Sequence, residues 1–135
     1  MIAFIIGLSS GLLLIALFVI LKKYDKKIVY GLTLTGIGFL YVGYTWSDLL
    51  SLIITSIQAI VFVALAYYGI KKSMYILALG FFLHGIWDLV YHPFDKPGLI
   101  PPQYDVFCLT IDFVIGIYLL VLARQSSSSV KRTNA

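Results

Sequence analysis

Two histidines and a carboxylate lie in an otherwise apolar stretch of the chain, from Leu83 to Pro93. His84, Asp88 and His92 follow one another at intervals of four residues. Side chains four residues apart lie on the same face of a helix, so this spacing predicts a polar stripe about two turns long. Imidazole nitrogens and carboxylate oxygens bind divalent metal ions and also carry protons. The stripe therefore predicts one of these two kinds of chemistry.

A second polar stripe follows at Asp105, Cys108 and Asp112, whose spacing of three and four residues also fits one helix face. The segment between the two stripes, residues 93–104 and here called the proline segment, holds all four prolines, which end helices. We expect it to join two antiparallel helices. A rise of about 1.5 Å per residue then places His84 level with Asp112, and the two stripes meet inside the protein.

We interpret the joined stripes as a candidate site for zinc or another divalent metal ion. The candidate metal ligands are His84, Asp88, Cys108, Asp112 and His92. Catalytic zinc keeps three protein ligands and a water molecule, and Asp88 and Asp112 are the candidates for catalytic roles. A bound ion would activate water, so the sequence predicts a metal-dependent hydrolase whose lipid-like substrate enters from the side. The chain contains no glutamate that would serve as its base.

Other functions fit the same residues. Chains of aspartate and histidine act as proton relays, so one alternative is a protein that binds or transports a small molecule or lipid, or a proton-coupled transporter, without metal. In a purely structural alternative, His84 and Asp112 only hold two helices together. Cys108 could also act as a thiol nucleophile with His84 as its base, although no third group that would orient them is visible in the sequence.

Further polar and aromatic side chains are expected near this site. Asp48, Ser51, Thr55 and Gln58 share one helix face by their spacing of three, four and three residues, and Thr55 reaches the depth of the site. Aromatic side chains on the first stripe either contact a ligand or pack in the interior. The candidate ligand-binding residues are Trp87, Tyr91, Thr55, Ser51 and Asp48.

The composition predicts that the helices carrying these residues cross a membrane. Hydrophobic residues make up 61% of the 135 residues and charged residues 12%, and the mean hydropathy is +0.99. Soluble domains average about 25% charged residues, and about 20 apolar residues span a bilayer as a helix. We expect a single all-α domain of five transmembrane helices, residues 1–123, and a flexible tail, residues 124–135, into which the last helix could extend. The expected spans are residues 2–21, 28–44, 49–70, 73–92 and 106–123.

The basic residues predict the orientation of these spans. Nine of the ten Lys and Arg residues fall in the loops after the first and third spans or in the tail, and the remaining one is Lys96. Short loops rich in Lys and Arg stay cytoplasmic. We therefore expect a multi-pass cell-membrane protein with its N-terminus and proline segment outside and its tail in the cytoplasm. The net charge of +4 then reflects topology and not a nucleic-acid partner.

Small and aromatic residues of the first two spans predict where helices meet each other and the membrane surface. Glycines usually mark close contact between membrane helices, either inside the bundle or in a homodimer. The glycines in question are Gly7, Gly11, Gly31, Gly36, Gly38 and Gly43. Tyr41, Tyr44 and Trp46 are expected to form an aromatic belt at the end of the second span. Membrane lipids are the other expected partners.

The chain resembles an uncharacterised family of small bacterial integral membrane proteins. The family has a Leu-His-x-x-Trp-Asp core, a histidine pair, a proline-rich outer loop and a Cys-containing stretch that ends in Asp. The matching residues are Leu83-His84, Trp87-Asp88, His92, Pro97, Pro101-Pro102 and Cys108 to Asp112. Tyr91 stands where the family has the first histidine of its pair. The resemblance covers roughly residues 30–120 and brings no activity, so it supports the choice of residues and not a function.

Overall fold

Five helices make up most of the described chain. The structure is a computed structural model that describes residues 1–20 and 24–133. The helices are α1 (Ile2–Ile20), α2 (Lys26–Thr45), α3 (Leu49–Lys71), α4 (Met74–Tyr91) and α5 (Tyr104–Thr133), and a 3₁₀ turn, η1 (His92–Phe94), follows α4. All five are long and apolar enough to cross a membrane, and the described residues contain no strand. The predicted all-α fold with five candidate spans is confirmed.

Short polar side chains and proline set several helix ends. Asp25, Asp48 and Ser73 precede α2, α3 and α4, and each accepts a hydrogen bond of 2.8 to 3.1 Å from a backbone N–H two or three residues later. Such caps satisfy backbone donors that the first turn leaves free. At the far end of α4, Pro93 lies in η1 and the chain leaves the helix.

Helix α5 does not end at Ala123, where the sequence predicted that a flexible tail begins. It continues to Thr133, since the chain after Gly116 contains neither proline nor glycine to interrupt it. The predicted topology rests partly on Lys22 and Lys23, which lie outside the described residues.

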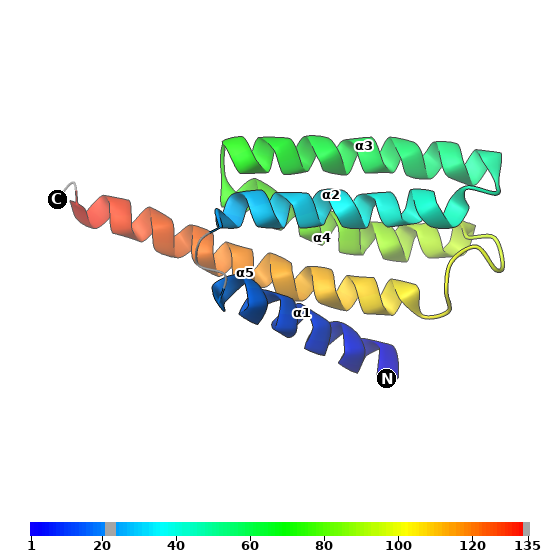
Figure 1. The fold of residues 1–135 in the computed structure, drawn as a ribbon, viewed down its shortest axis with the longest axis horizontal. Helices are drawn as coiled ribbons and strands as arrows, with labels where there is room; N and C mark the ends of the chain where they lie inside the picture. The colour runs from blue at the N-terminus through cyan, green and yellow to red at the C-terminus, as the bar shows by residue number, and fades with distance from the viewer. Residues whose placement is uncertain (21–23, 134–135) are drawn as a thin grey trace.

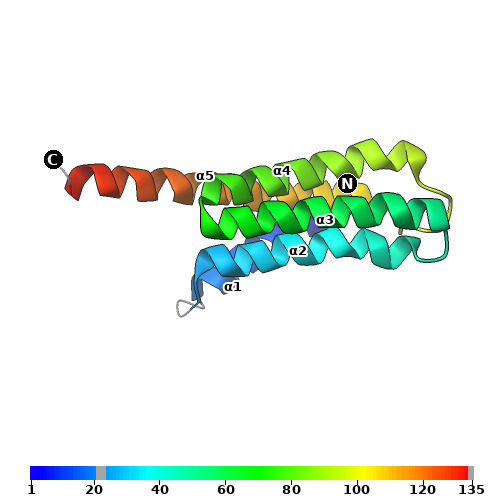
Figure 2. The same cartoon turned by 90° about the horizontal axis from the view of Figure 1, so that it is seen from above.

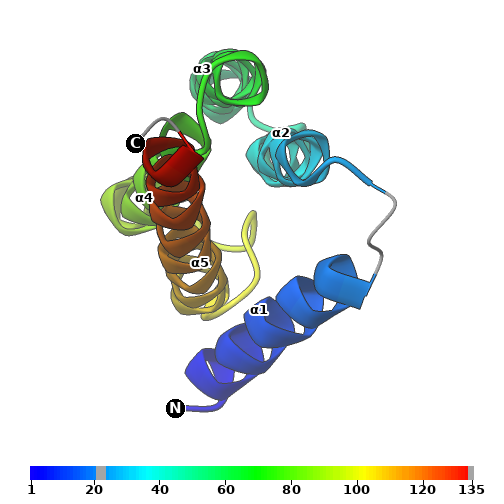
Figure 3. The same ribbon diagram turned by 90° about the vertical axis from the view of Figure 1, so that its left-hand side faces the viewer.

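The helices α2 to α5 run alongside one another, and α1 packs along α5 (Figures 1 and 2). Viewed end-on, α1 stands away from α3 on the far side of α5 (Figure 3). Two glycines allow the close contact between α1 and α5. A Cβ atom added to Gly7 would come within 2.7 Å of the Phe107 carbonyl oxygen, and one on Gly11 within 3.0 Å of the Val114 side chain.

The glycines of α2 are divided between two environments. Gly31 and Gly38 face α3, where an added Cβ would meet the side chains of Ile70 and Phe62. Gly36 and the glycine at position 43 face open space, with nothing within 4 Å of an added Cβ. The first two glycines therefore pack closely inside the bundle, as predicted, whereas a contact of the other two with a second copy stays a prediction.

The interior of the bundle changes character along its length. Near the α3–α4 turn, a buried cluster of apolar and aromatic side chains packs the four helices α2, α3, α4 and α5 together. Near the proline segment, a second cluster contains Tyr41, Tyr91, Tyr104 and Cys108. Buried polar side chains lie between the two clusters, and the candidate site is in this polar layer.

Candidate metal centre

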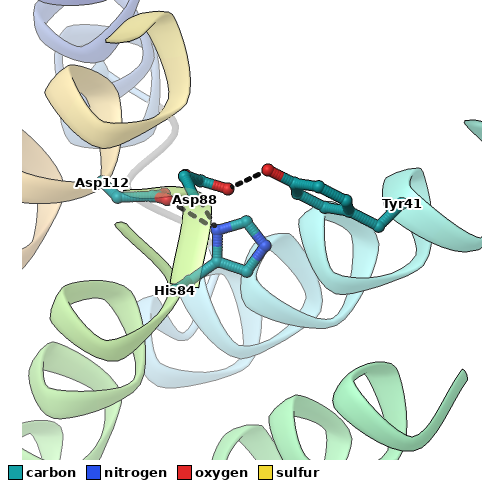
Figure 4. Close-up of polar contacts among 4 residues, drawn as sticks. All are labelled: Tyr41, His84, Asp88 and Asp112. Carbon is teal, nitrogen blue, oxygen red and sulfur yellow. Dashed lines mark hydrogen bonds and ion pairs between the residues drawn. The ribbon is translucent and has the colours of Figure 1, made fainter. Parts of the chain in front are cut away.

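Helices α4 and α5 place three ionisable side chains side by side in the polar layer. His84 and Asp88 lie one turn apart on α4, and Asp112 faces them from α5 (Figure 4). The three residues are at most 1% exposed. Because the proline segment makes the two helices antiparallel, His84 and Asp112 come to the same level, as the spacing predicted.

The distances within this group are short. His84 Nδ1 lies 2.7 Å from Asp112 Oδ2 and 3.7 Å from Asp88 Oδ2. Each residue offers one ligand atom, and these three atoms all lie within 4.8 Å of one another. A lone pair on Nδ1 and a carboxylate oxygen repel each other at such a separation. A proton therefore lies between His84 and Asp112 at this distance, and a metal ion bound by both residues would need them to move apart.

Two atoms of the group lack hydrogen-bond partners within the described part of the chain: Asp88 Oδ2 and His84 Nε2. Nε2 points toward α2, where the backbone of Ile37 lies close to the ring without completing a hydrogen bond of normal geometry. Histidines that bind metals usually donate their other ring N–H to a carbonyl or carboxylate. Because Nε2 of His84 points toward α2, the other ring nitrogen, Nδ1, faces the two carboxylates.

Tyr41 of α2 completes the group, and the sequence analysis assigned it a different role. It was predicted to belong to an aromatic belt, but its side chain is 1% exposed and its hydroxyl donates a 2.6 Å hydrogen bond to Asp88 Oδ1 (Figure 4). The signal that could have placed it is periodicity. Tyr41 shares a helix face with Leu34 and Thr45, which are also fully buried.

A small cavity of about 90 Å³ leads from the proline segment to Asp88. Tyr41 and Tyr91 line it from the helices, and residues 100–103 cover it from the loop. A water molecule needs only about 10–15 Å³ of such space, so the cavity has room for a few water molecules but not for a lipid. On the opposite side of His84, the Phe62 ring packs against the imidazole at a centroid distance of 4.8 Å.

His92 and Cys108 do not belong to the group that could hold a metal ion. The 3₁₀ turn carries His92 to the mouth of the cavity, where its 67% exposed side chain pairs with Asp105 at 3.2 Å. Cys108 lies one turn from Asp112 along α5, buried in the tyrosine cluster. The structure thus joins three of the five predicted metal ligands.

The predicted ligand-binding residues of α3 make structural contacts. Thr55 shares a 2.7 Å hydrogen bond with Thr45 of α2, and Asp48 caps α3 and pairs with Lys96 at 2.5 Å. Ser51 is buried beside them, and the Thr55 hydroxyl also donates to its backbone carbonyl. These contacts attach α3 to α2 and to the proline segment, and none of these side chains belongs to the metal-ligand group.

The aromatic candidates of α4 lie next to this group. Trp87 stacks on Tyr91 with ring centroids 5.5 Å apart and an angle of 20° between the rings. Tyr91 lines the cavity below the proline segment, whereas Trp87 lines a groove between α3 and α4. Of these two predicted ligand-binding residues, only Tyr91 therefore faces the cavity that leads to Asp88.

A family model for a family of unknown function, DUF6010, matches residues 2–125 of this chain. The chain belongs to the DUF6010 family. The match covers more of the chain than the resemblance at residues 30–120 indicated, and it includes all the helices that carry the site. No curated protein and no solved structure matches the chain. DUF6010 membership brings no activity, so a function has to be argued from the geometry of the site.

Proposed function

We propose that the protein binds a divalent metal ion inside the membrane through His84, Asp88 and Asp112. The observation that carries the proposal is the convergence of three buried ligand atoms within 4.8 Å of one another. One nitrogen and carboxylate oxygens form a donor set that zinc accepts. Zinc–ligand distances of about 2.0–2.2 Å put neighbouring tetrahedral ligands roughly 3.4 Å apart. The 3.7 Å between His84 Nδ1 and Asp88 Oδ2 is close to this spacing, whereas the 2.7 Å between His84 Nδ1 and Asp112 Oδ2 must lengthen when an ion binds.

The reaction we propose for this centre is hydrolysis of a lipid amide or ester. Three protein ligands leave a fourth position for water, which a bound zinc ion makes acidic. The water oxygen adds to the carbonyl carbon, the bond to the amine or alcohol breaks, and a water proton passes to that leaving group. The cavity beside Asp88 has room for the water molecules that would carry this proton. Because the cavity holds only about 90 Å³, the lipid must enter between helices.

A second candidate function is proton transfer without a metal ion. It is favoured by the continuous contacts from Tyr41 through Asp88 and His84 to Asp112, of which two are hydrogen bonds of 2.6 and 2.7 Å. Such a chain can pass a proton from the cavity to Asp112. The 2.7 Å contact between His84 and Asp112 holds a proton, which a metal ion would have to displace while moving the two side chains apart. The two proposals therefore predict different outcomes of one titration.

Zinc titration of metal-stripped protein, followed with a competing chromophoric chelator, tests the metal proposal. We expect one zinc ion per chain for wild type. His84→Ala, Asp88→Asn and Asp112→Asn should each weaken binding by more than about 100-fold, because residues that only support ligands already contribute about 10–100-fold. Cys108→Ser and His92→Ala are matched controls, since they remove potential ligands that lie outside the group. Binding that is equal in wild type and His84→Ala would refute the proposal.

The double variant His84→Leu with Asp112→Leu separates a metal site from a structural clamp. Replacing a buried polar pair by apolar residues of similar size is often neutral or stabilising, so the variant should melt no earlier than wild type. It should nevertheless bind no zinc. A variant that unfolds, in a protein whose wild type binds no zinc, would instead assign the pair to holding α4 and α5 together.

A further inference from the structure

A groove of about 270 Å³ lies between α3 and α4. Its volume is near the lower end of those that hold small ligands. Its lining residues carry no charge, and most of them are apolar; Val61 and Leu65 line it from α3, and Leu83 and Val90 from α4. The groove is distinct from the cavity at Asp88, with which it shares no lining residue.

Two polar side chains in this groove lack hydrogen-bond partners. Gln58 is only 4% exposed, and neither its amide nitrogen nor its amide oxygen has a partner among the described residues. The indole nitrogen of Trp87, on the facing helix, also lacks one. Gln58 lies about 13 Å from the start of α3 by helical rise. At that depth in a bilayer there is little water to pair with it, so its isolation is unfavourable.

We propose that the groove binds a single-chain lipid whose polar group both donates and accepts a hydrogen bond, such as a long-chain alcohol or primary amide. The Gln58 amide offers a donor and an acceptor, and the Trp87 indole offers a second donor. The uncharged lining favours an uncharged polar group over a phosphate or carboxylate. The hydrocarbon chain lies along the apolar walls, and the proposal requires the Gln58 amide to turn so that its covered atoms reach the groove.

The concave shape favours a thin lipid chain over a second copy of the protein. Gln58 is recessed below the surface of the bundle, so a facing helix would have to insert a long side chain to reach it. The proposal does not rest on the metal centre. The Phe62 side chain lies between the groove and His84, lining the groove and packing against the imidazole.

Photolabelling of the purified full chain in lipid nanodiscs tests this proposal. Two probes are compared: hexadecanol and hexadecane, each carrying a diazirine at the same carbon near one end, with labelled peptides located by mass spectrometry. We expect the alcohol to label the groove-lining parts of α3 and α4 about three- to tenfold more than the alkane, the range that one hydrogen bond contributes. Equal labelling by both probes would overturn the proposal.

Three variants identify the polar group responsible. Gln58→Leu should reduce labelling by the alcohol to the level of the alkane while leaving alkane labelling unchanged, which also shows that the groove remains folded. Trp87→Phe should reduce the preference partly, because it removes only one donor. Gln125→Leu makes the same chemical change at an exposed position of α5 and should have no effect. A full preference for the alcohol in Gln58→Leu would refute the assignment.

The alternative occupant has its own readout. A cysteine at Ile86, which is 46% exposed and lines the groove, is introduced together with Cys108→Ser. If two copies met at this face, mild oxidation in the membrane would join them by a disulfide. Such dimers would overturn the lipid proposal, and their absence together with labelling by the alcohol supports it.

Discussion

Tyr41 is the residue that fixes the position of Asp88. Its hydroxyl donates to Asp88 Oδ1, while Asp88 Oδ2 has no partner within the described chain. A carboxylate held in this way presents its free oxygen in one direction only. Side chains that orient a metal ligand are typically worth about 10–100-fold in metal affinity. Tyr41 therefore belongs functionally with the three candidate ligands, although it cannot itself be one of the expected zinc ligands.

We predict that Tyr41→Phe weakens zinc binding by about tenfold. It should also lower the free energy of unfolding by about 1–3 kcal/mol, because it leaves a buried carboxylate oxygen unpaired. Thermal melting in detergent reports the second effect even if no metal binds.

Tyr91→Phe is the matched control for Tyr41→Phe. It makes the same chemical change in the same cluster, but the Tyr91 hydroxyl has no partner among the described residues. Its loss should not reduce either quantity. Equal effects of the two variants would contradict the role assigned to Tyr41.

The sequence predicted the candidate site only where helical periodicity was sufficient. His84 and Asp88 share a helix face by their spacing, and Asp112 follows once the proline segment makes α4 and α5 antiparallel. Tyr41 was not predicted, because a tyrosine near the end of a span fits both a membrane belt and a buried donor. The exclusion of His92 could not be predicted, because the spacing of four residues assumes a helix that in fact ends at Tyr91.

At the scale of elements, an ion pair connects the proline segment to α3. Lys96 pairs with Asp48 at 2.5 Å, and Asp48 also caps α3. The hydrogen bond from Lys96, helped by the bonds from Ser51, lowers the pKa of Asp48 to about 2. Near the mouth of the cavity, burial raises the pKa of Asp95 above its ordinary value. One pair of charged groups, Lys96 and Asp48, therefore connects the proline segment to the start of α3.

We predict that acid releases this connection between α3 and the proline segment. A carboxylate with a lowered folded-state pKa contributes stability above its unfolded pKa of about 3.9, and that contribution is lost as the pH falls through the folded value. A spin label on a cysteine at position 99, with Cys108→Ser, should stay immobile down to about pH 4 and become mobile between pH 4 and the folded-state value of about 2.

Two variants test the source of this acid transition. Asp48→Asn should leave the spin label mobile at every pH, because the amide carries no charge for Lys96. Asp25→Asn changes the aspartate that caps α2 and should leave the transition in place. A transition that persists in Asp48→Asn would assign it to another group.

The sequence predicted the helices better than their ends and contacts. Runs of about 20 apolar residues identify spans because the bilayer requires that length, and all five spans coincide with helices to within a few residues, apart from the C-terminal end of α5. The serine-rich polar stretch has no apolar pattern, so the sequence left open whether the last helix extends into it, and α5 in fact continues to Thr133. Gly36 and Gly31 could not be told apart, since composition does not say which face of α2 meets α3.

At the scale of the whole molecule, the metal-ligand group and the groove open in different directions. The cavity at Asp88 reaches the proline segment, whereas the groove lies between α3 and α4.

Helix α1 has the least buried of the five candidate spans, with 11% of it buried inside the protein. Lipid or a second copy must cover the remainder in a membrane, so the homodimer expected from the glycines of α1 and α2 stays a prediction. The two glycines that face α5 are not free to take part in it.

The orientation of the bundle decides which side of the membrane supplies the cavity. The end of the bundle at the proline segment carries Lys96, Asp48, Asp95 and Asp105. In the sequence, the other nine basic residues follow the first and third spans or belong to the tail. Since loops rich in Lys and Arg stay cytoplasmic, we predict that the proline segment faces outward and that ions or protons reach Asp88 from outside.

Cysteines in place of Ser47 and Ser126, each with Cys108→Ser, test this prediction with nearly isosteric changes at exposed positions of opposite ends. A membrane-impermeant thiol reagent should label the cysteine at position 47 in intact cells, and the one at position 126 only after lysis. The reverse pattern would make the cavity open to the cytoplasm, and the charge argument would then be wrong for this protein.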